Sequence, residues 1–352
     1  MKLFAILKIT HLLATLTLLN TFNYNINAQS NDHDNLVNEA MRLVNSPNPV
    51  FESLNNNPLD SATISNMGFE QVYENQSHSL IVRDRKKLFA YKYEKEESNV
   101  TVLLVHGVLS NGYLMNKTAG LLSEKINAEV YAIDLRGHGR SDGNPGDVDY
   151  IDQYADDLED VIKIIKSEKP KNKIILVGHS MGGGISLKYS LLKNSLLIDA
   201  YILLAPLLSV DSPTISKKEK GSDEDKFIDI HINRIIGLKM LNSIGNHKYD
   251  NLPVLFFNLP EGMPLRSYSY RANESMTPEN YIEGLASVNK PLLVLAGSND
   301  EAFAASEFDS VVKNNSDGDV FLIEGENHNS IRHSIKCMNI ITEWVNKNQL
   351  VN

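Results

Sequence analysis

Two segments of the 352-residue chain match the pattern Gly-x-Ser-x-Gly, which can present a serine hydroxyl group as a nucleophile. Residues 139–143 (Gly-Arg-Ser-Asp-Gly) precede Asn-Pro-Gly, which prevents a helix from starting there. Residues 178–182 (Gly-His-Ser-Met-Gly) follow the apolar run 174–177 directly and lead into a helical pattern. A strand, a sharp turn and a helix in this order form a nucleophile elbow. The second segment therefore predicts Ser180 as the nucleophile, and an ordinary turn between strand and helix is the alternative.

A histidine beyond Ser180 is needed to accept the serine proton, because in an elbow enzyme the acid and the histidine follow the serine along the chain. Of the ten histidines, only His328 and His333 lie beyond the apolar run 292–295. His328 belongs to a polar turn directly after the run 320–323, whereas we expect His333 inside the next helix. We therefore predict His328 as the base, with His333 as the alternative.

An acidic side chain should orient this histidine, and the run 292–295 leads directly into Ala-Gly-Ser-Asn-Asp. Asp300 would accept the proton of His328 Nδ1, keep the ring in one tautomer and stabilise the imidazolium. Glu301 is the neighbouring alternative, and Asp211 is a second one. The other interpretation of Asp300 is an ordinary carboxylate on a surface loop.

Backbone N–H groups that bind the developing oxyanion would complete the site, and each such donor contributes about 10²- to 10³-fold in rate. One donor should be the N–H of Met181, directly after the nucleophile. The other should come from the loop after an early strand, which predicts the N–H of Val108. We expect His106 to brace this loop, because it precedes Ser180 on another strand.

Short apolar runs that alternate with helical patterns should position these residues. The runs are continuously apolar, which is typical of strands buried on both faces of a parallel sheet. The predicted fold class is therefore α/β, with a mostly parallel sheet flanked by helices. The predicted strands are residues 80–82, 88–93, 102–105, 130–133, 174–177, 201–204, 292–295 and 320–323.

The alternation stops over residues 207–289, where we expect a helical cap inserted between late strands. The core would then comprise residues 71–206 and 290–352. Four isoleucines have the spacing of one helix face that ends near Gly245, namely Ile228, Ile232, Ile235 and Ile236. Apolar cap residues could line an acyl-chain pocket or pack against the core, and these are Ile232, Ile236, Leu255, Phe256 and Phe257.

Residues 1–28 read as a secretory signal peptide, with a basic start, an apolar centre and Ala28 before the cleavage point. The apolar centre is about half as long as the roughly 20 residues of a membrane span, so we expect no stable membrane anchor. Residues 29–70 would form an N-terminal arm. We therefore expect a secreted protein, periplasmic or extracellular.

Charge and cysteine content exclude several other classes of protein. The chain has 34 Lys and Arg against 44 Asp and Glu, a net charge of −10, and loss of two lysines with residues 1–28 makes it −12. An acidic balance of this size argues against a nucleic-acid partner. The single cysteine, Cys337, excludes an intramolecular disulfide and a multi-cysteine metal site.

Several segments resemble the α/β-hydrolase family. These are residues 104–107 (Leu-Val-His-Gly), 134–141 (Asp-Leu-Arg-Gly-His-Gly-Arg-Ser) and 178–183, with Asp300 and His328 later in the chain. Residues 134–141 together with 154–158 look most like the monoacylglycerol lipase and lysophospholipase branch, which overlaps with serine aminopeptidase-like sequences. The resemblance implies hydrolysis through an acyl-enzyme, without a metal or an organic cofactor.

Three functions are compatible with these residues. The first is a secreted carboxylic ester hydrolase, whose partner would be a small-molecule ester or lipid such as a monoacylglycerol, a lysophospholipid or a small acyl ester. The second is a serine aminopeptidase-like peptidase, which needs acidic groups to hold a substrate amine, and the cap offers Asp211, Glu219, Asp223 and Glu224. The third is a binding module without catalysis on the same fold.

Overall fold

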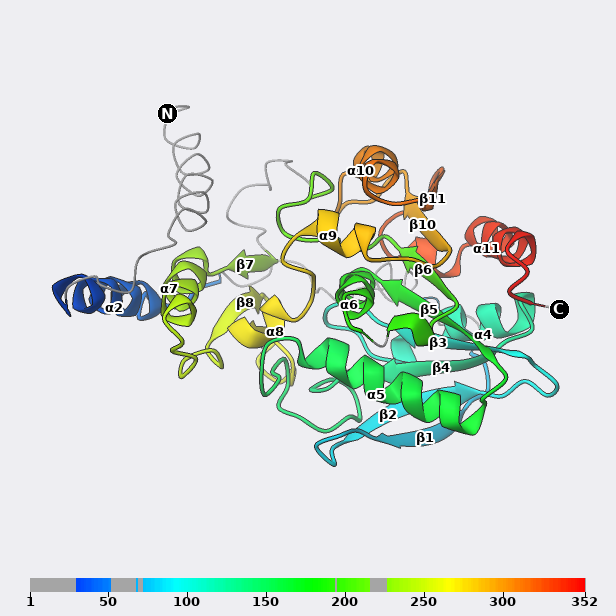
Figure 1. The fold of residues 1–352 in the computed structure, drawn as a ribbon, viewed down its shortest axis with the longest axis horizontal. Helices are drawn as coiled ribbons and strands as arrows, with labels where there is room; N and C mark the ends of the chain where they lie inside the picture. Colours follow the sequence, from blue (N-terminus) through cyan, green and yellow to red (C-terminus); the bar gives the residue numbers. More distant parts are fainter. Residues whose placement is uncertain (1–29, 52–67, 69–71, 194, 216–226, 352) are drawn as a thin grey trace. The chain divides into compact units, whose positions relative to one another are not determined.

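The computed structural model describes residues 30–51, 68, 72–193, 195–215 and 227–351 (Figure 1). The chain divides into two compact units, residues 1–47 with 233–247 and residues 48–232 with 248–352. The expected signal peptide lies outside the described residues, as do residues 29, 52–67, 69 and 70 of the expected arm. The division into arm, core and cap stays a prediction.

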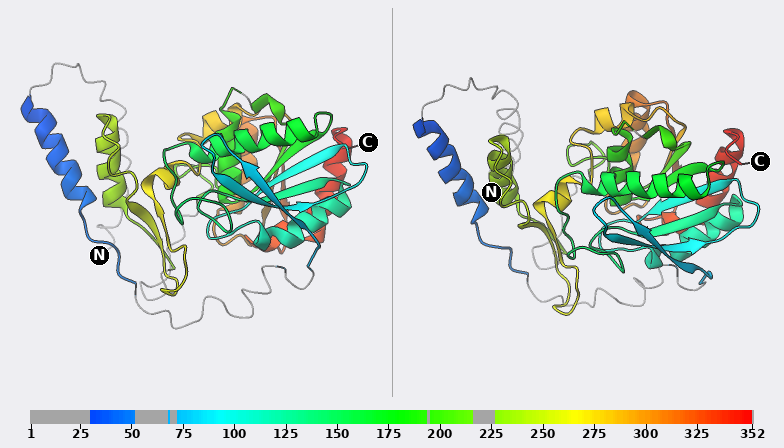
Figure 2. Two further views of the ribbon diagram at one scale, coloured as in Figure 1. Left: turned by 90° about the horizontal axis from the view of Figure 1, so that it is seen from below. Right: turned by 60° about the horizontal axis from the view of Figure 1, so that its bottom comes forward.

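Eight strands form the main sheet of the larger unit, in the order β1-β2-β4-β3-β5-β6-β10-β11. The pairs β1/β2 and β2/β4 are antiparallel, and all other neighbouring strands are parallel (Figures 1 and 2). The strands are β1 (Gln76–Ile81), β2 (Lys87–Tyr93), β3 (Val100–Val105), β4 (Glu129–Asp134), β5 (Lys173–His179), β6 (Ala200–Leu204), β10 (Leu292–Gly297) and β11 (Asp319–Ile323). Each apolar run predicted as a strand overlaps one of these, which confirms the α/β fold.

Helices cover both faces of the main sheet, and two apolar clusters fill the space between sheet and helices. One cluster includes side chains of α5, α6 and α10, and the other includes side chains of α4 and α11. Every residue of β3 and β4 is buried, which explains their continuous apolar character. The helices are α4 (Asn116–Lys125), α5 (Gln153–Glu168), α6 (Met181–Ser190), α8 (Tyr270–Glu274), α9 (Tyr281–Ala286), α10 (Phe308–Asn315) and α11 (Ile335–Lys347), with short 3₁₀ helices η1 (Tyr113–Met115), η2 (Ser195–Leu197), η4 (Ala305–Glu307) and η5 (Ser330–His333).

The segment between β6 and β10 differs from the expected helical cap, because it also contains a small antiparallel sheet. This sheet has the order β7-β8-β9 and comprises β7 (Ile228–Ile230), β8 (Pro253–Phe257) and β9 (Ser267–Ser269). Ile228, expected on a helix, lies in β7 and pairs with Phe257. Cross-strand pairing with the aromatic residues of β8 stabilises an extended backbone there, despite the helical spacing of the isoleucines.

The smaller unit contains two helices, α2 (Ser30–Val44) and all but the first residue of α7 (Ile232–Ser243). The guanidinium group of Arg234 donates hydrogen bonds to the carbonyl groups of Val44 and Ser46, at 3.0 and 3.1 Å. These carbonyl groups lie at the end of α2, where backbone acceptors have no partner within the helix. Arg234 therefore ties the two helices together. No helix in the described ranges is both long and apolar enough to cross a bilayer.

Candidate active site

Ser180 lies in a sharp turn between β5 and α6, at the edge of the main sheet. Its backbone has φ 53° and ψ −117°, a conformation that residues other than glycine rarely adopt. The Ser180 N–H donates to the carbonyl of Leu204 at 3.0 Å, and the Ser180 carbonyl accepts from the N–H of Leu207 at 2.9 Å. A side chain at position 182 would come within 2.3 Å of the carbonyl oxygen of Val105, so only glycine fits there. The turn has the geometry of a nucleophile elbow.

His328 and Asp300 come from the loops after β11 and β10, and their side chains meet. His328 Nδ1 lies 3.0 Å from Asp300 Oδ2 and 3.2 Å from Oδ1. The Asp300 side chain is fully buried, and its Oδ1 also accepts from the N–H groups of Ala302 and Phe303. Because a carboxylate can only accept, Nδ1 carries the proton, which leaves the lone pair of Nε2 available as a base.

His179, the residue before the nucleophile, holds the His328 loop at the elbow. Its Nε2 donates to the carbonyl of His328 at 2.9 Å, and the two ring centroids are 4.9 Å apart. Burial lowers the pKa of His179 well below its ordinary value, so this ring stays neutral. The ring of Phe303 packs edge-on against His328 at 5.1 Å. The residue next to Ser180 in the chain is therefore in direct contact with His328.

The alternative acids and base have other contacts. Glu301 accepts from the backbone N–H of His328 at 3.1 Å, so it supports the loop and does not bind the ring. Asp211 accepts a hydrogen bond from the hydroxyl of Ser209. His333 lies in η5, one turn beyond His328. Asp300 is thus the carboxylate that the fold places on the His328 ring.

The loop after β3 supplies the second backbone donor beside the elbow. A side chain at Gly107 would come within 3.1 Å of Ser180 Cβ, which shows how closely this loop approaches the nucleophile. Among the described residues, the N–H groups of Val108 and Met181 have no acceptor. Met181 is the first residue of α6, where helix N–H groups lack partners. An oxyanion-binding role for these two N–H groups stays a prediction.

His106 braces this loop, as expected. Its Nδ1 donates to the carbonyl of Gly107 at 2.8 Å, and its Nε2 accepts from the N–H of Leu135 at 3.1 Å. Burial lowers the pKa of His106 well below its ordinary value. The neutral ring thus links the loops after β3 and β4.

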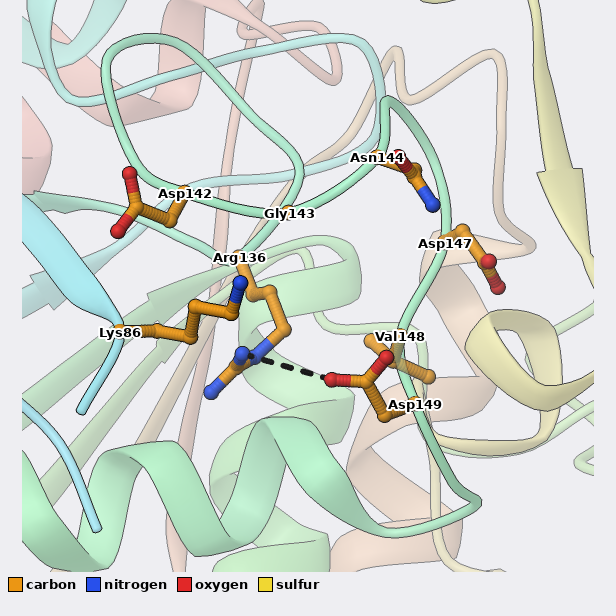
Figure 3. A pocket seen from close by; sticks show the side chains of 8 residues that line it. All are labelled: Lys86, Arg136, Asp142, Gly143, Asn144, Asp147, Val148 and Asp149. Atoms are coloured by element: carbon orange, nitrogen blue, oxygen red, sulfur yellow. Dashed lines mark ion pairs between the residues drawn. The ribbon is translucent and has the colours of Figure 1, made fainter. Parts of the chain in front are cut away.

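Ser141, in the other Gly-x-Ser-x-Gly segment, has a structural role. Its hydroxyl donates to the carbonyl of Asp134 at 2.6 Å and accepts from the N–H of Phe89 at 2.8 Å. A cavity of about 390 Å³ lies beside this segment, and Figure 3 shows Arg136 in it with an ion pair to Asp149. Its lining residues are Lys86, Arg136, Asp142, Gly143, Asn144, Asp147, Val148 and Asp149. The cavity is therefore separate from Ser180, Asp300 and His328.

The five apolar residues expected near an acyl chain lie in different environments. Phe257 is buried on β8 and packs edge-on against Tyr268, at 6.0 Å between ring centroids. Leu255 and Phe256 are half-buried on the same strand, and Ile232 is 42% exposed. Ile236 lies on α7 in the smaller unit. Core packing thus accounts for Phe257, and a lining role for the others stays a prediction.

No metal site is found in the part of the chain that the structure describes, where no three His, Cys, Asp or Glu side chains cluster. The thiol of Cys337 is buried in the core, and burial raises its pKa. It is therefore a packing residue and not a second nucleophile.

Tyr268 contacts the loop beside the elbow and was not identified from the sequence. The N–H of Leu109, next to Val108, donates to the hydroxyl of Tyr268 at 2.8 Å. The two residues are 159 positions apart in the chain. No local pattern marks such a contact, because in the sequence Tyr268 only follows the apolar run 254–257.

Comparison with known proteins gives a consistent set of relatives. The family model described as serine aminopeptidase, S33, matches residues 96–231. A monoacylglycerol lipase of Mycolicibacterium smegmatis is 40% identical over 60 residues, which are 17% of this chain and 21% of that protein. A putative esterase/lipase of Mycoplasma genitalium is 27% identical over 253 residues, 68% of this chain and 86% of that protein. Several other curated relatives are matched over only 25% to 46% of their own length.

Solved structures show the same fold. An esterase of Pyrococcus furiosus is 20% identical, with a TM-score of 0.50 over 86% of this chain and 97% of the esterase. At this level of identity the likeness establishes the fold alone. The similar sequences, by contrast, include enzymes named as esterases and lipases.

Proposed function

We propose that this chain, which is similar to esterases and lipases of the α/β-hydrolase family, cleaves carboxylic esters through an acyl-enzyme on Ser180. The observation that carries the proposal is the hydrogen bond from His328 Nδ1 to the buried Asp300, held next to the elbow by His179. The proposed substrates are small-molecule esters or lipids, such as monoacylglycerols, lysophospholipids or small acyl esters. The similarity to a monoacylglycerol lipase supports this substrate class.

The reaction begins when Ser180 Oγ attacks the ester carbonyl carbon and His328 Nε2 takes the hydroxyl proton. The negative charge that develops on the carbonyl oxygen is stabilised by the N–H groups of Val108 and Met181. Asp300 stabilises the imidazolium that forms. His328 then donates the proton to the leaving alcohol oxygen, the carbon–oxygen ester bond breaks, and the acyl group remains on Ser180.

Water completes the cycle. His328 Nε2 removes a proton from a water molecule, whose oxygen attacks the acyl-enzyme carbonyl, and the same two N–H groups stabilise the second oxyanion. The Ser180–acyl bond then breaks as Ser180 regains a proton from His328. The carboxylic acid leaves, and the enzyme is restored.

The variant Ser180→Ala should lose on the order of 10⁶-fold in kcat, because a nucleophile and its base act as a unit. Purified protein should react once per chain with a fluorophosphonate probe and cleave short- or medium-chain acyl esters, and the variant should do neither. Ser141→Ala is the matched control, since its hydroxyl is engaged with Asp134 and Phe89. A decrease of less than tenfold in Ser180→Ala would place the nucleophile elsewhere.

A serine aminopeptidase-like peptidase is the second candidate, and the match of the serine aminopeptidase model to residues 96–231 favours it. Of the acidic residues expected to hold a substrate amine, Asp211 is described, while Glu219, Asp223 and Glu224 lie outside the described residues. Faster turnover of aminoacyl amides than of esters with the same acyl group would support this activity. A binding module without catalysis is the remaining alternative, and complete lack of fluorophosphonate labelling would favour it.

We also propose that the protein is secreted after removal of residues 1–28, without a stable membrane anchor. The basic start, apolar centre and small residues of this segment support the proposal. N-terminal sequencing of protein recovered from the periplasm or medium should begin at Gln29. Recovery of a chain that still begins at Met1 would contradict secretion by cleavage.

A further inference from the structure

The turn that carries the Val108 N–H contains a residue in an unusual conformation. The N–H of Ser110 donates to the carbonyl of Gly107 at 3.3 Å, which closes a turn over residues 107–110. Leu109 occupies the third position with φ 56°, where glycine or asparagine is usual. This left-handed conformation is energetically unfavourable for a leucine. The turn therefore depends on contacts outside itself.

Tyr268 provides that contact through a chain of hydrogen bonds. Its buried hydroxyl oxygen accepts from the N–H of Leu109 at 2.8 Å and lies 2.9 Å from His138 Nε2. His138 Nδ1 lies 2.9 Å from the carbonyl of Arg136, which can only accept, so Nδ1 carries the proton and Nε2 accepts from Tyr268. Burial lowers the pKa of His138 to about 4, which keeps the ring neutral for this role.

Tyr268 is itself held in place, because β9 is fixed to the loop after β4. The N–H of Ser269 donates to the carbonyl of Gly146 at 3.0 Å, and Arg271 forms an ion pair with Asp147 at 2.7 Å. Gly146 has φ +68°, and a side chain there would come within 2.0 Å of the carbonyl oxygen of Ser267. The hydroxyl of Tyr268 thus reaches the turn from an anchored strand.

We propose that Tyr268 is a positioning residue for the oxyanion hole. By fixing the N–H of Leu109, its hydroxyl fixes the turn that aims the N–H of Val108 toward the substrate carbonyl oxygen. This inference rests on the proposed function. It gives the sheet β7-β8-β9 a part in positioning the catalytic groups, although Tyr268 itself contacts no reacting atom.

The variant Tyr268→Phe removes only the oxygen atom, so we expect the fold to persist and the turn to loosen. The expected result is a decrease of about 10- to 100-fold in kcat, with KM changed less than about twofold, because a displaced donor weakens only the transition state. Rates should be counted per active site, titrated with the fluorophosphonate probe, so that partial unfolding does not contribute. Binding of a trifluoromethyl ketone, which forms a tetrahedral adduct with serine, should weaken by the same factor as kcat/KM.

Tyr154→Phe is the matched control. Its hydroxyl is buried without a hydrogen-bond partner among the described residues, and its ring lies 6.2 Å from that of His138. Loss of this hydroxyl breaks no hydrogen bond, so kcat should stay within about twofold of the unchanged protein. The pair of variants separates the Tyr268 hydrogen bond from a general effect of losing a buried tyrosine hydroxyl.

Hydrogen–deuterium exchange of the segment 106–112 gives a readout that does not require activity. Tyr268→Phe should accelerate exchange there, and Tyr154→Phe should not. Unaltered exchange together with unaltered kcat in Tyr268→Phe would overturn the inference, as would equal effects in both variants. If the unchanged protein neither labels nor cleaves esters but exchange responds as expected, the proposed function fails while the positioning contact stands.

Discussion

At the scale of single residues, the carboxylates of Asp300 and Glu301 are neighbours in the chain but bind different groups of His328. Asp300 is buried and bonds the ring, whereas Glu301 bonds only the backbone N–H of His328. Their spacing from His328 in sequence is nearly the same. The difference comes from the direction in which each side chain leaves the loop after β10.

The variant Asp300→Asn should lower kcat on the order of 10⁴-fold, as loss of the triad aspartate does in serine proteases, because an amide no longer holds the required tautomer of His328. Glu301→Gln should change kcat less than about tenfold, since its amide oxygen can still accept from the backbone. Steady-state ester hydrolysis per titrated active site checks both. A larger loss in Glu301→Gln than in Asp300→Asn would assign the acid role to Glu301.

At the scale of elements, the sequence was most informative for the strands of the main sheet. The continuous apolar runs of β3, β4, β5, β6 and β10 follow directly from burial on both faces, so a local pattern was enough to locate them. The run of β11 was located in the same way, although β11 is an edge strand in which Phe321 and Leu322 are exposed. It was least informative for the insertion, where Ile228 has helical spacing but pairs in β7. Pairing with a distant strand, and not local propensity, determines that segment.

Arg136 shows how a buried charge joins elements. Arg136 follows β4 in the chain. Its guanidinium group pairs with Asp157 on α5 at 2.8 Å, and both side chains are 2% exposed. Arg136→Met should lower the free energy of unfolding by about 3–5 kcal/mol, because Asp157 would stay buried without a cation. Arg83, 40% exposed in its ion pairs with α5, is the control, and Arg83→Met should cost less than about 1 kcal/mol. Urea unfolding measures the free energy of unfolding of both variants. Equal losses would show that the buried Arg136–Asp157 ion pair contributes no more than the exposed pairs of Arg83.

At the scale of the whole molecule, acid should act on the fold through its buried histidines. Burial lowers the pKa of His138 from 6.5 to about 4. Between these values the unfolded chain binds a proton that the folded protein does not, so the free energy of unfolding falls as the pH falls from 6.5 to 4. The shift corresponds to a loss of about 3 kcal/mol across this interval.

His138→Gln should remove this contribution. Urea unfolding at several pH values between 7 and 4 should show a smaller loss of stability in the variant, with the difference from the unchanged protein growing as the pH falls. The comparison reports His138 together with its effect on the neighbouring His106, whose pKa is lowered by burial and by His138. Parallel curves for the two proteins would show that His138 is not held neutral by the fold.

The sequence by itself located the strands of the main sheet and the turn at Ser180, and it predicted Asp300 and His328 as the acid and the base. These features depend on local apolar patterns, on glycine at tight turns and on covalent order, all of which can be read along the chain. Only the tertiary structure decided that Asp300 reaches the ring of His328 and that Tyr268 reaches Leu109, 159 residues away. It also decided that α7 packs with α2 through Arg234. Such contacts depend on side-chain direction and on burial between distant segments, which no local pattern encodes.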